Sequence, residues 1–270
     1  MLVSIIVPIY NQERTIRKDL ETIHDVMEKT RWDFEIIGVV DGSPDNSFKE
    51  AKKTKESKIK VHGYNTNRGK GYAVRYGMAR ALGDLIAFID AGMDINPNSI
   101  SMVLEHMEWY DSDIIVASKR HSASKVNYSG LRRLYSIGYY FGVRLLFGLN
   151  IRDTQTGLKI YKRHVLEDVL PRLLVKAFAF DIELLAVAHR LGYRKIHEAP
   201  VELALDFTEG SKWDRNRPLF LDPHILAMLI DTLAVFYRLK LLEYYDNHNQ
   251  RKWVYDKELD MKINTGEVSR

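Results

Sequence analysis

The sequence predicts an α/β fold in which a mostly parallel sheet is flanked by helices. Over the first hundred residues, short β-branched runs alternate with amphipathic stretches, which is the pattern of repeated strand–helix–strand units. The chain has 270 residues, of which 46% are hydrophobic and 28% charged, so it can bury one large core and is not a disordered or collagen-like protein. It contains no cysteine, which excludes a disulfide scaffold, a thiolate zinc site and a cysteine nucleophile.

The first part of the chain is expected to form strands and helices in alternation. Strands are predicted at residues 2–9, 34–40, 59–64, 85–89 and 114–117, and helices at 13–29, 45–55, 70–82 and 96–110. Pro97 suits the first turn of the last of these helices. Ligands in open sheets of this kind bind beyond the carboxyl ends of the strands, so chemistry is expected in the segments that follow each strand.

After residue 120 the sequence becomes more helical and more basic. Helices are predicted at 131–149, 165–170, 181–191 and 225–242, and a late strand at 196–203. From residue 243 onward five basic and six acidic side chains are mixed, which is typical of a peripheral tail. We therefore expect one α/β domain over residues 1–215, followed by a C-terminal amphipathic helix and charged tail over 216–270.

Charge is unevenly distributed along the chain. The net charge is +4, but residues 117–163 carry ten Lys and Arg against the single acid Asp153, so that segment has a charge of +9 and the remainder −5. This predicts an anionic partner: a phosphate group, an acidic lipid headgroup or a nucleic acid. A nucleic acid is the least favoured of the three, because the aromatic residues there follow helical spacing. With no stretch of about 18 uncharged apolar residues and no signal peptide, an integral membrane protein is not expected.

The ends of the first two predicted strands carry polar residues. Pro8 indicates an end or edge position in its strand, since proline cannot donate to a sheet. Tyr10 and Asn11 then either present a ring and an amide to a ligand or form an ordinary capped turn. Asp41, at the tip of the second strand, either accepts hydrogen bonds from a base or ribose or only caps its own turn.

Two further segments follow the third and fourth strands. The turn at 67–71, Asn-Arg-Gly-Lys-Gly, opens a helix with glycines and basic side chains, a combination that suits phosphate. Its spacing is neither that of a P-loop nor that of a dinucleotide fingerprint. Asp90 and Asp94 follow the most apolar strand, and two carboxylates so placed can share a hard divalent cation. Alternatively, Asp94 only begins the turn before the next helix.

These four segments, in this order, resemble family 2 glycosyltransferases of the GT-A fold, and within them the polyprenyl-phosphate sugar synthases. The resemblance extends to about residue 215. It is strengthened by three later segments: Arg-Asp-Thr-Gln-Thr-Gly-Leu-Lys at 152–159, Ala-Phe-Asp-Ile-Glu-Leu-Leu at 179–185 and Gly-Ser-Lys at 210–212. Those three look most like the segments of dolichyl-phosphate β-glucosyltransferases.

The resemblance implies a nucleotide-sugar site with some departures from the family's pattern. The implied contacts come from Pro8, Tyr10, Asn11, Glu13, Asp41, Lys70 and Asp90. Val40 stands where the family usually has the first of two adjacent acids, and Gln12 stands where Glu is common. Gly92 replaces the second acid of the Asp-x-Asp metal signature. We therefore expect Asp90 and Asp94 together to hold Mg²⁺ or Mn²⁺, with the donor diphosphate completing the coordination shell.

By the same resemblance, the reaction is an inverting transfer of a hexose, with UDP-glucose the favoured donor, to a polyprenyl phosphate such as dolichyl phosphate. Asp90, Asp153 and Asp181 are the candidate catalytic residues, the last two orienting sugar or acceptor unless they are only structural. The acceptor phosphate is expected to contact Arg120, Arg133, Ser211 and Lys212. A phosphate monoester has its second pKa at about 6, so a strong general base is unnecessary, although Asp153 is available as a weak one.

The sequence allows two positions for its amphipathic helices and two alternatives to the lipid-phosphate acceptor. The helices at 131–149 and 225–242 either lie in a membrane interface, with basic side chains at their edges, or pack in the core or against a second copy. A lipid acceptor favours a peripheral position on the cytoplasmic face of the membrane. One alternative is the same fold with a glycan or soluble hydroxyl acceptor, which needs a true base. Another is a catalytically impaired nucleotide-binding protein, suggested by Val40 and Gly92.

Overall fold

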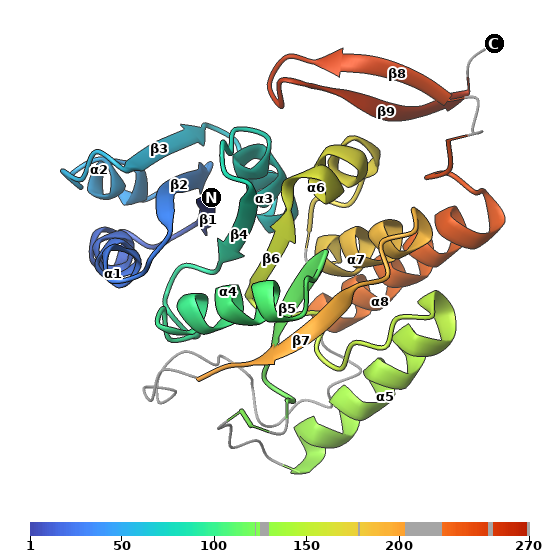
Figure 1. Cartoon of the computed structure of the whole chain (residues 1–270). Coiled ribbons are helices and arrows are strands. Elements are labelled where there is room, and N and C mark those ends of the chain that lie inside the picture. Colours follow the sequence, from blue (N-terminus) through green and yellow to red (C-terminus); the bar gives the residue numbers. More distant parts are fainter. Residues whose placement is uncertain (122, 125–129, 178, 203–222, 248–250, 269–270) are drawn as a thin grey trace.

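The protein is described by a computed structural model (Figure 1) that covers residues 1–121, 123–124, 130–177, 179–202, 223–247 and 251–268. Two of the predicted acceptor residues, Ser211 and Lys212, lie outside the described residues, and so does the side chain of Arg133. The expected domain boundary at 215 also lies outside them. The remaining predicted site residues are described with their side chains.

A seven-stranded sheet forms the centre of the molecule, in the order β3-β2-β1-β4-β6-β5-β7. Its strands are β1 (Leu2–Ile9), β2 (Asp33–Asp41), β3 (Ile59–Tyr64), β4 (Leu85–Ile89), β5 (Ile114–Ser118), β6 (Leu158–Lys162) and β7 (Ile196–Pro200). All neighbouring pairs are parallel except those of β6, which is antiparallel to both β4 and β5. The sequence did not predict β6, because two lysines interrupt its short apolar run.

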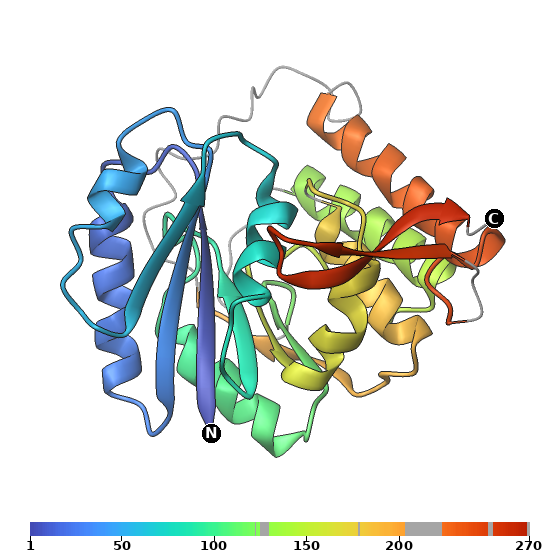
Figure 2. The same cartoon turned by 90° about the horizontal axis from the view of Figure 1, so that it is seen from above.

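Helices cover both faces of this sheet (Figures 1 and 2). They are α1 (Ile16–Glu28), α2 (Ser47–Ala51), α3 (Lys70–Met78), α4 (Ser99–Trp109), α5 (Gly130–Phe147), α6 (Arg163–Val169), α7 (Phe180–Arg190) and α8 (Pro223–Phe236). A 3-10 turn, η1 (Leu170–Arg172), follows α6, and a π-helical turn, η3 (Tyr237–Leu241), extends α8. Among the described helices, none combines the length and the apolarity needed to cross a membrane.

Two apolar cores lie on opposite faces of the sheet. Alternation along β1 illustrates the division: Val3 and Ile5 join the core under α1 and α4, whereas Ile6 joins the core under α3, α5, α6 and α7. Val235 and Leu239, from α8 and η3, belong to that second core as well. The C-terminal helix is therefore packed into the same core as the sheet.

The charged segment after η3, expected as a peripheral tail, forms a β-hairpin. Its strands are β8 (Arg251–Asp256) and β9 (Met261–Val268), and they pair antiparallel. Figure 2 shows the hairpin reaching from the α8 side across to α3. Leu259 at its turn and Asn264 in β9 are buried, and the Tyr244 hydroxyl donates to the Asn264 side chain at 3.1 Å. Charged residues within both strands obscured this hairpin in the sequence.

Candidate active site

Four charged side chains meet where β4, β6, α3 and α7 converge. The Lys70 Nζ lies 2.7 Å from Asp90 Oδ1 and 4.0 Å from Asp181 Oδ2. The Lys159 Nζ lies 2.6 Å from Asp181 Oδ1. Acid and base thus alternate in a chain of four, Asp90–Lys70–Asp181–Lys159, which we call the four-charge chain. It unites three predicted site residues with one, Lys159, that had not been assigned to the site.

The four-charge chain has a sealed end and an open end. The side chains of Lys159 and Asp181 are 0% and 4% exposed, whereas those of Lys70 and Asp90 are 21% and 39% exposed. Burial lowers the pKa of Lys159, and the nearby Asp181 opposes that change. Burial also disfavours the charge of Lys70, but Asp90 and Asp181 outweigh it and raise the pKa of Lys70. The open end therefore presents a firmly protonated ammonium beside an accessible carboxylate.

The segment that enters β6 fixes the position of Asp90. The backbone N–H of Asp90 donates to the carbonyl of Gly157 at 3.0 Å. A Cβ at position 157 would lie only 2.3 Å from Asp90 Oδ2, so only glycine leaves room for the carboxylate. The carbonyl of Thr156 accepts a 2.7 Å hydrogen bond from the Lys159 ammonium. The motif at 152–159 therefore places both ends of the four-charge chain.

Asp41 holds the glycine-rich turn in place. Its carboxylate is nearly buried and accepts hydrogen bonds from the backbone N–H groups of Arg68, at 2.7 Å, and Gly69, at 2.9 Å. Gly69 has a φ of 96°, and a Cβ there would lie 2.5 Å from the carbonyl oxygen of Lys176. This turn leads directly into α3, whose first residue is Lys70. Asp41 therefore fixes the turn after β3 and not its own turn, and its contact with a base or ribose stays a prediction.

The loop after β1 is latched to the loop after β2. The backbone N–H of Asn11 donates to Ser43 Oγ at 2.8 Å, and Glu13 Oε2 accepts from the Asn46 N–H at 3.0 Å. Glu13 therefore serves the start of α2. Asp45 accepts hydrogen bonds from Ser43 and from nearby backbone groups, and these outweigh the opposing effect of burial and lower the pKa of Asp45 to about 2.

Pro8 and Tyr10 lie at the carboxyl end of β1. Pro8 is the penultimate residue of the strand, and pairing with β4 stops two residues earlier, at Ile6. The predicted end position is confirmed, although β1 is a central strand. Tyr10 is 44% exposed and precedes Asn11, which turns the chain with a φ of 53°. An aromatic side chain is thus exposed at the carboxyl ends of the parallel strands, the same end of the sheet at which the four-charge chain is open to solvent.

The residues expected to hold a metal ion are separated by a turn. Asp94 is exposed and follows Gly92 and Met93, which have φ values of 88° and 55°. Within the described ranges, no group of three or more His, Asp or Glu side chains is arranged to hold a metal. Mg²⁺ is usually held by one or two carboxylates and by substrate phosphates. Asp90 is paired with Lys70 in this structure, and a cation shared by Asp90 and Asp94 stays a prediction.

Asp153 precedes β6 in the chain and contacts the residues that follow β5. Its Oδ2 accepts the backbone N–H of Lys119 at 3.0 Å, and its own N–H donates to Glu198 Oε1 at 3.2 Å. Burial raises the pKa of Asp153, against the effect of the neighbouring Lys119. The Arg120 guanidinium donates to the carbonyl of Arg152 at 3.1 Å. The predicted acceptor side thus has one carboxylate and at least one cation in the described structure.

Two buried charges support the site and were not predicted as parts of it. Lys159 could have been recognised as a lysine within an otherwise apolar run, a position that requires a partner. Glu183, in the first turn of α7, is completely buried and accepts from the N–H of Val175 at 2.8 Å and from the Tyr245 hydroxyl at 2.7 Å. Burial raises the pKa of Glu183. Glu183 thereby holds in place the segment around Val175, which packs against Gly69.

Comparison with known sequences gives a consistent set of matches. Residues 4–170 match the family described as Glycosyl transferase family 2. A dolichyl-phosphate beta-glucosyltransferase of Drosophila melanogaster is 33% identical over 225 residues, which make up 77% of this chain and 68% of that protein. The human protein of the same description is 32% identical over 227 residues, with the same two coverages of 77% and 68%.

Solved structures confirm the predicted fold class. Glucosyl-3-phosphoglycerate synthase from Mycobacterium tuberculosis, in complex with Mn²⁺, uridine diphosphate and glucosyl-3-phosphoglycerate, matches with a TM-score of 0.62 at 20% identity. The match covers 99% of this chain and 88% of that one. Mannosyl-3-phosphoglycerate synthase from Rubrobacter xylanophilus has a TM-score of 0.67 at 15% identity, with coverages of 100% and 87%. At these identities the similarity concerns the fold alone.

Proposed function

The chain belongs to glycosyl transferase family 2, and we propose that it transfers a hexose, from UDP-glucose in preference, to a polyprenyl phosphate such as dolichyl phosphate. The observation that carries this proposal is the open end of the four-charge chain, where the ammonium of Lys70 lies 2.7 Å from Asp90 at the edge where the parallel strands end. Support for the substrates comes from the dolichyl-phosphate beta-glucosyltransferases to which the chain is similar.

Binding of the donor diphosphate is assigned to the start of α3. The first turn of a helix leaves backbone N–H groups without intrahelical acceptors and carries the positive end of the helix dipole. Lys70 adds a full positive charge there, and Asp181, which is itself fixed by Lys159, attracts it. As the nucleoside diphosphate leaves, its growing negative charge is offset by this preorganised cation. Tyr10 is placed to contact the nucleotide portion.

A divalent cation has a place in this scheme. Asp90, with Asp94, would hold Mg²⁺ or Mn²⁺, which would neutralise charge on the departing diphosphate. With such a cation on Asp90, Lys70 would be available to pair with the phosphates. Both interactions draw on the same carboxylate, so donor binding and release of the Lys70–Asp90 pair are expected to be coupled.

The acceptor phosphate enters from the side of Asp153 and Arg120. A phosphate monoester is largely dianionic at neutral pH, so its oxygen attacks the anomeric carbon without a strong base and inverts the configuration. Arg120, together with the predicted contributions of Arg133, Ser211 and Lys212, holds this phosphate. Asp153 orients the acceptor or the sugar.

A membrane surface is the proposed location, on the cytoplasmic face. The support is a set of exposed apolar side chains on α5, α8, η3 and the residue after η3: Phe141, Leu145, Leu226, Leu229, Ile230, Leu233, Tyr237, Leu241 and Leu242. Exposed apolar groups this numerous are typical of an interaction surface. A helix with such a face lies in the interface plane and does not need to span the bilayer.

A hydroxyl acceptor is the second candidate, and the environment of Asp153 favours it. Burial raises the pKa of this carboxyl group, which moves it towards the range of a general base for an alcohol. A glycan or small soluble acceptor would then replace the lipid phosphate. The pH dependence of the rate separates the two, because only the hydroxyl acceptor requires a deprotonated Asp153.

Transfer assays with defined substrates test the proposal. The purified chain is incubated with UDP-glucose, UDP-N-acetylglucosamine or GDP-mannose and a short-chain prenyl phosphate, with Mn²⁺, Mg²⁺ or a chelator. We expect a prenyl-phosphate hexose product from UDP-glucose, loss of that product with chelator, and its loss in Asp90→Asn. Lys18→Ala, on the exposed face of α1, is the control. Transfer to hydroxyl acceptors alone would overturn the lipid-phosphate assignment.

A further inference from the structure

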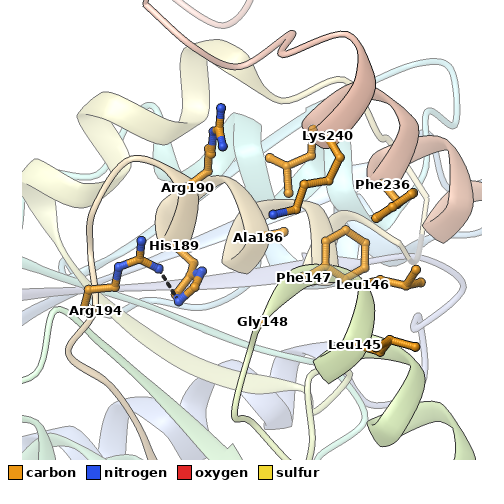
Figure 3. Close-up of a pocket in the computed structure, with 11 residues that line it drawn as sticks. Leu145, Leu146, Phe147, Gly148, Ala186, His189, Arg190, Arg194, Phe236 and Lys240 are labelled. Atoms are coloured by element: carbon orange, nitrogen blue, oxygen red, sulfur yellow. Dashed lines mark hydrogen bonds between the residues drawn. The ribbon is translucent and has the colours of Figure 1, made fainter.

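A cleft of about 510 Å³ lies away from the four-charge chain, between the end of α5, the end of α7 and the α8–η3 helix (Figure 3). Its apolar wall includes Leu146, Phe147, Ala186, Phe236 and Leu239. Its polar lining consists of the basic side chains of Arg190, Arg194 and Lys240 and of the His189 imidazole. The helix α7 connects the two places, since it begins at the four-charge chain and ends at the cleft. Its rise of about 1.5 Å per residue separates Asp181 from Arg190 by about 14 Å.

Two of the cations at this cleft are available to an anion. Arg190 is already paired with Asp246, at 2.5 Å. His189 contacts the Arg194 guanidinium, and burial together with Arg194 and Lys240 lowers the pKa of His189, so its imidazole is neutral at neutral pH. Over the described ranges, neither Arg194 nor Lys240 forms an ion pair with an acid. In Figure 3 the Lys240 side chain extends over the cleft towards α7.

The rim of the cleft continues into an exposed apolar surface. Leu145, at the end of α5, is 86% exposed and lines the cleft. Tyr237 and Leu241, on η3, are 51% and 67% exposed. An occupant that matches all of these features needs an anionic head for Arg194 and Lys240 and an apolar part for the leucines. Free phosphate meets only the first requirement, and an apolar peptide meets only the second.

We infer that this cleft binds the headgroup of an anionic phospholipid, with the phosphodiester between Arg194 and Lys240 and the acyl chains beside Leu145 and η3. The site is distinct from the four-charge chain, which lies at the other end of α7. The inference rests on the membrane-surface part of the proposed function. Its effect is to fix the orientation of the protein on the bilayer, because a headgroup bound at one end of α7 keeps the other end at a constant height.

Vesicle co-sedimentation tests the site with two charge-matched variants. The wild-type chain is compared with the double variant Arg194→Glu/Lys240→Glu and with Lys18→Glu/Lys55→Glu, whose exposed lysines lie on and near the helices of the opposite face of the sheet. Vesicles are phosphatidylcholine alone or phosphatidylcholine with phosphatidylserine. We expect wild type and control to bind the anionic vesicles, and the cleft variant to bind at least about tenfold more weakly, since each basic residue near an anionic surface contributes substantially. Leu145→Ala is expected to weaken binding in the same direction.

Each other outcome overturns the inference. Equal loss in both double variants would mean that overall charge, and not the cleft, attracts the vesicle. Release of the wild type by millimolar inorganic phosphate at constant ionic strength would identify a free-anion site. A wild-type dimer in analytical ultracentrifugation that dissociates in the cleft variant would identify a contact between copies of this chain.

A separate assay distinguishes this inference from the proposed function. Transfer to a water-soluble prenyl phosphate is measured without vesicles, and the cleft variant is expected to retain it in full. If the wild type shows no such transfer but the vesicle results hold, the proposed acceptor is wrong and the lipid site stands. If transfer occurs but no variant binds vesicles differently, the lipid site is wrong and the proposed function stands.

Discussion

The two ends of helix α7 treat charge in opposite ways. At its first turn Asp181 is buried between Lys70 and Lys159, so every charge there has a partner. At its last turn and beyond, Arg190 is paired but Arg194 stands beside a neutral His189 in an open cleft. Both arrangements agree with the helix dipole, which favours acids at the start and bases at the end. The comparison shows that paired, buried charges fix the positions of side chains, whereas surface cations without an acidic partner are available to bind an anionic ligand.

The largest effect is expected from breaking the buried pair. Asp181→Asn leaves Lys159 completely buried without a counter-charge, which should cost about 3–5 kcal/mol of unfolding free energy. Urea denaturation measures this loss. The double variant Asp181→Asn/Lys159→Met removes both charges and should recover most of the stability. A single variant as stable as the wild type would show that the inner end of α7 does not depend on pairing.

The open end of the four-charge chain should matter for catalysis more than for stability. Lys70→Ala removes the cation that faces the donor diphosphate, and kcat should fall about 10²–10³-fold, as it does when one preorganised donor is lost. Steady-state kinetics with UDP-glucose measures this change. Lys195→Ala removes an equally charged group from an exposed ion pair with Asp111 and should leave kcat unchanged. Similar kinetics in both variants would contradict the role of Lys70.

A matched pair of glycine substitutions tests the placement of Asp90. In Gly157→Ala the new Cβ would meet the Asp90 carboxylate, and displacement of this group should lower kcat by about tenfold or more. Gly138→Ala, in α5, adds a Cβ with nothing within 4 Å and should leave the rate unchanged. A circular dichroism melt serves to confirm that both variants fold. Equal rates for the two would show that the position of Asp90 is not critical.

The smallest effect is expected at Asp45, where the loops after β1 and β2 meet, because hydrogen bonds near the surface add little to stability. The folded pKa of Asp45 is about 2, below its usual value of 3.8, so its contribution to stability is present above pH 3.8 and is lost as the pH falls towards 2. Because this group is only partly buried and stays in contact with solvent, the contribution should not exceed about 1 kcal/mol. Unfolding measured from pH 5 to 2 should show a shallower decline in Asp45→Asn. An identical pH profile would contradict this assignment.

Features that depend on neighbouring residues could be predicted from the sequence, whereas features that depend on distant residues could not. The strands β1 to β5 and the loops that follow them were predictable, because continuous apolar runs end at residues such as Asp41 and Asp90 that only a strand tip tolerates. The strand β6 was not, because Lys159 breaks its apolar pattern and makes sense only once Asp181, 22 residues later, lies beside it. The bonds from Asp41 to the N–H groups of Arg68 and Gly69 were likewise not predictable, because 27 and 28 residues separate these partners. Arg133, Ser211 and Lys212 stay predictions.

The C-terminal hairpin has a consequence for how the protein is made. Glu258, at the tip of the hairpin, pairs with Arg68 at 2.5 Å, and its carbonyl accepts from Arg80 at 2.6 Å. These partners are separated by 190 and 178 residues. During translation the turn that carries Lys70 therefore leaves the ribosome long before the strands that brace it, at a rate of about 5–20 residues per second. For about 10–40 s at that rate the turn is without Glu258 and depends on partners from earlier in the chain, such as Asp41 and the segment around Lys176.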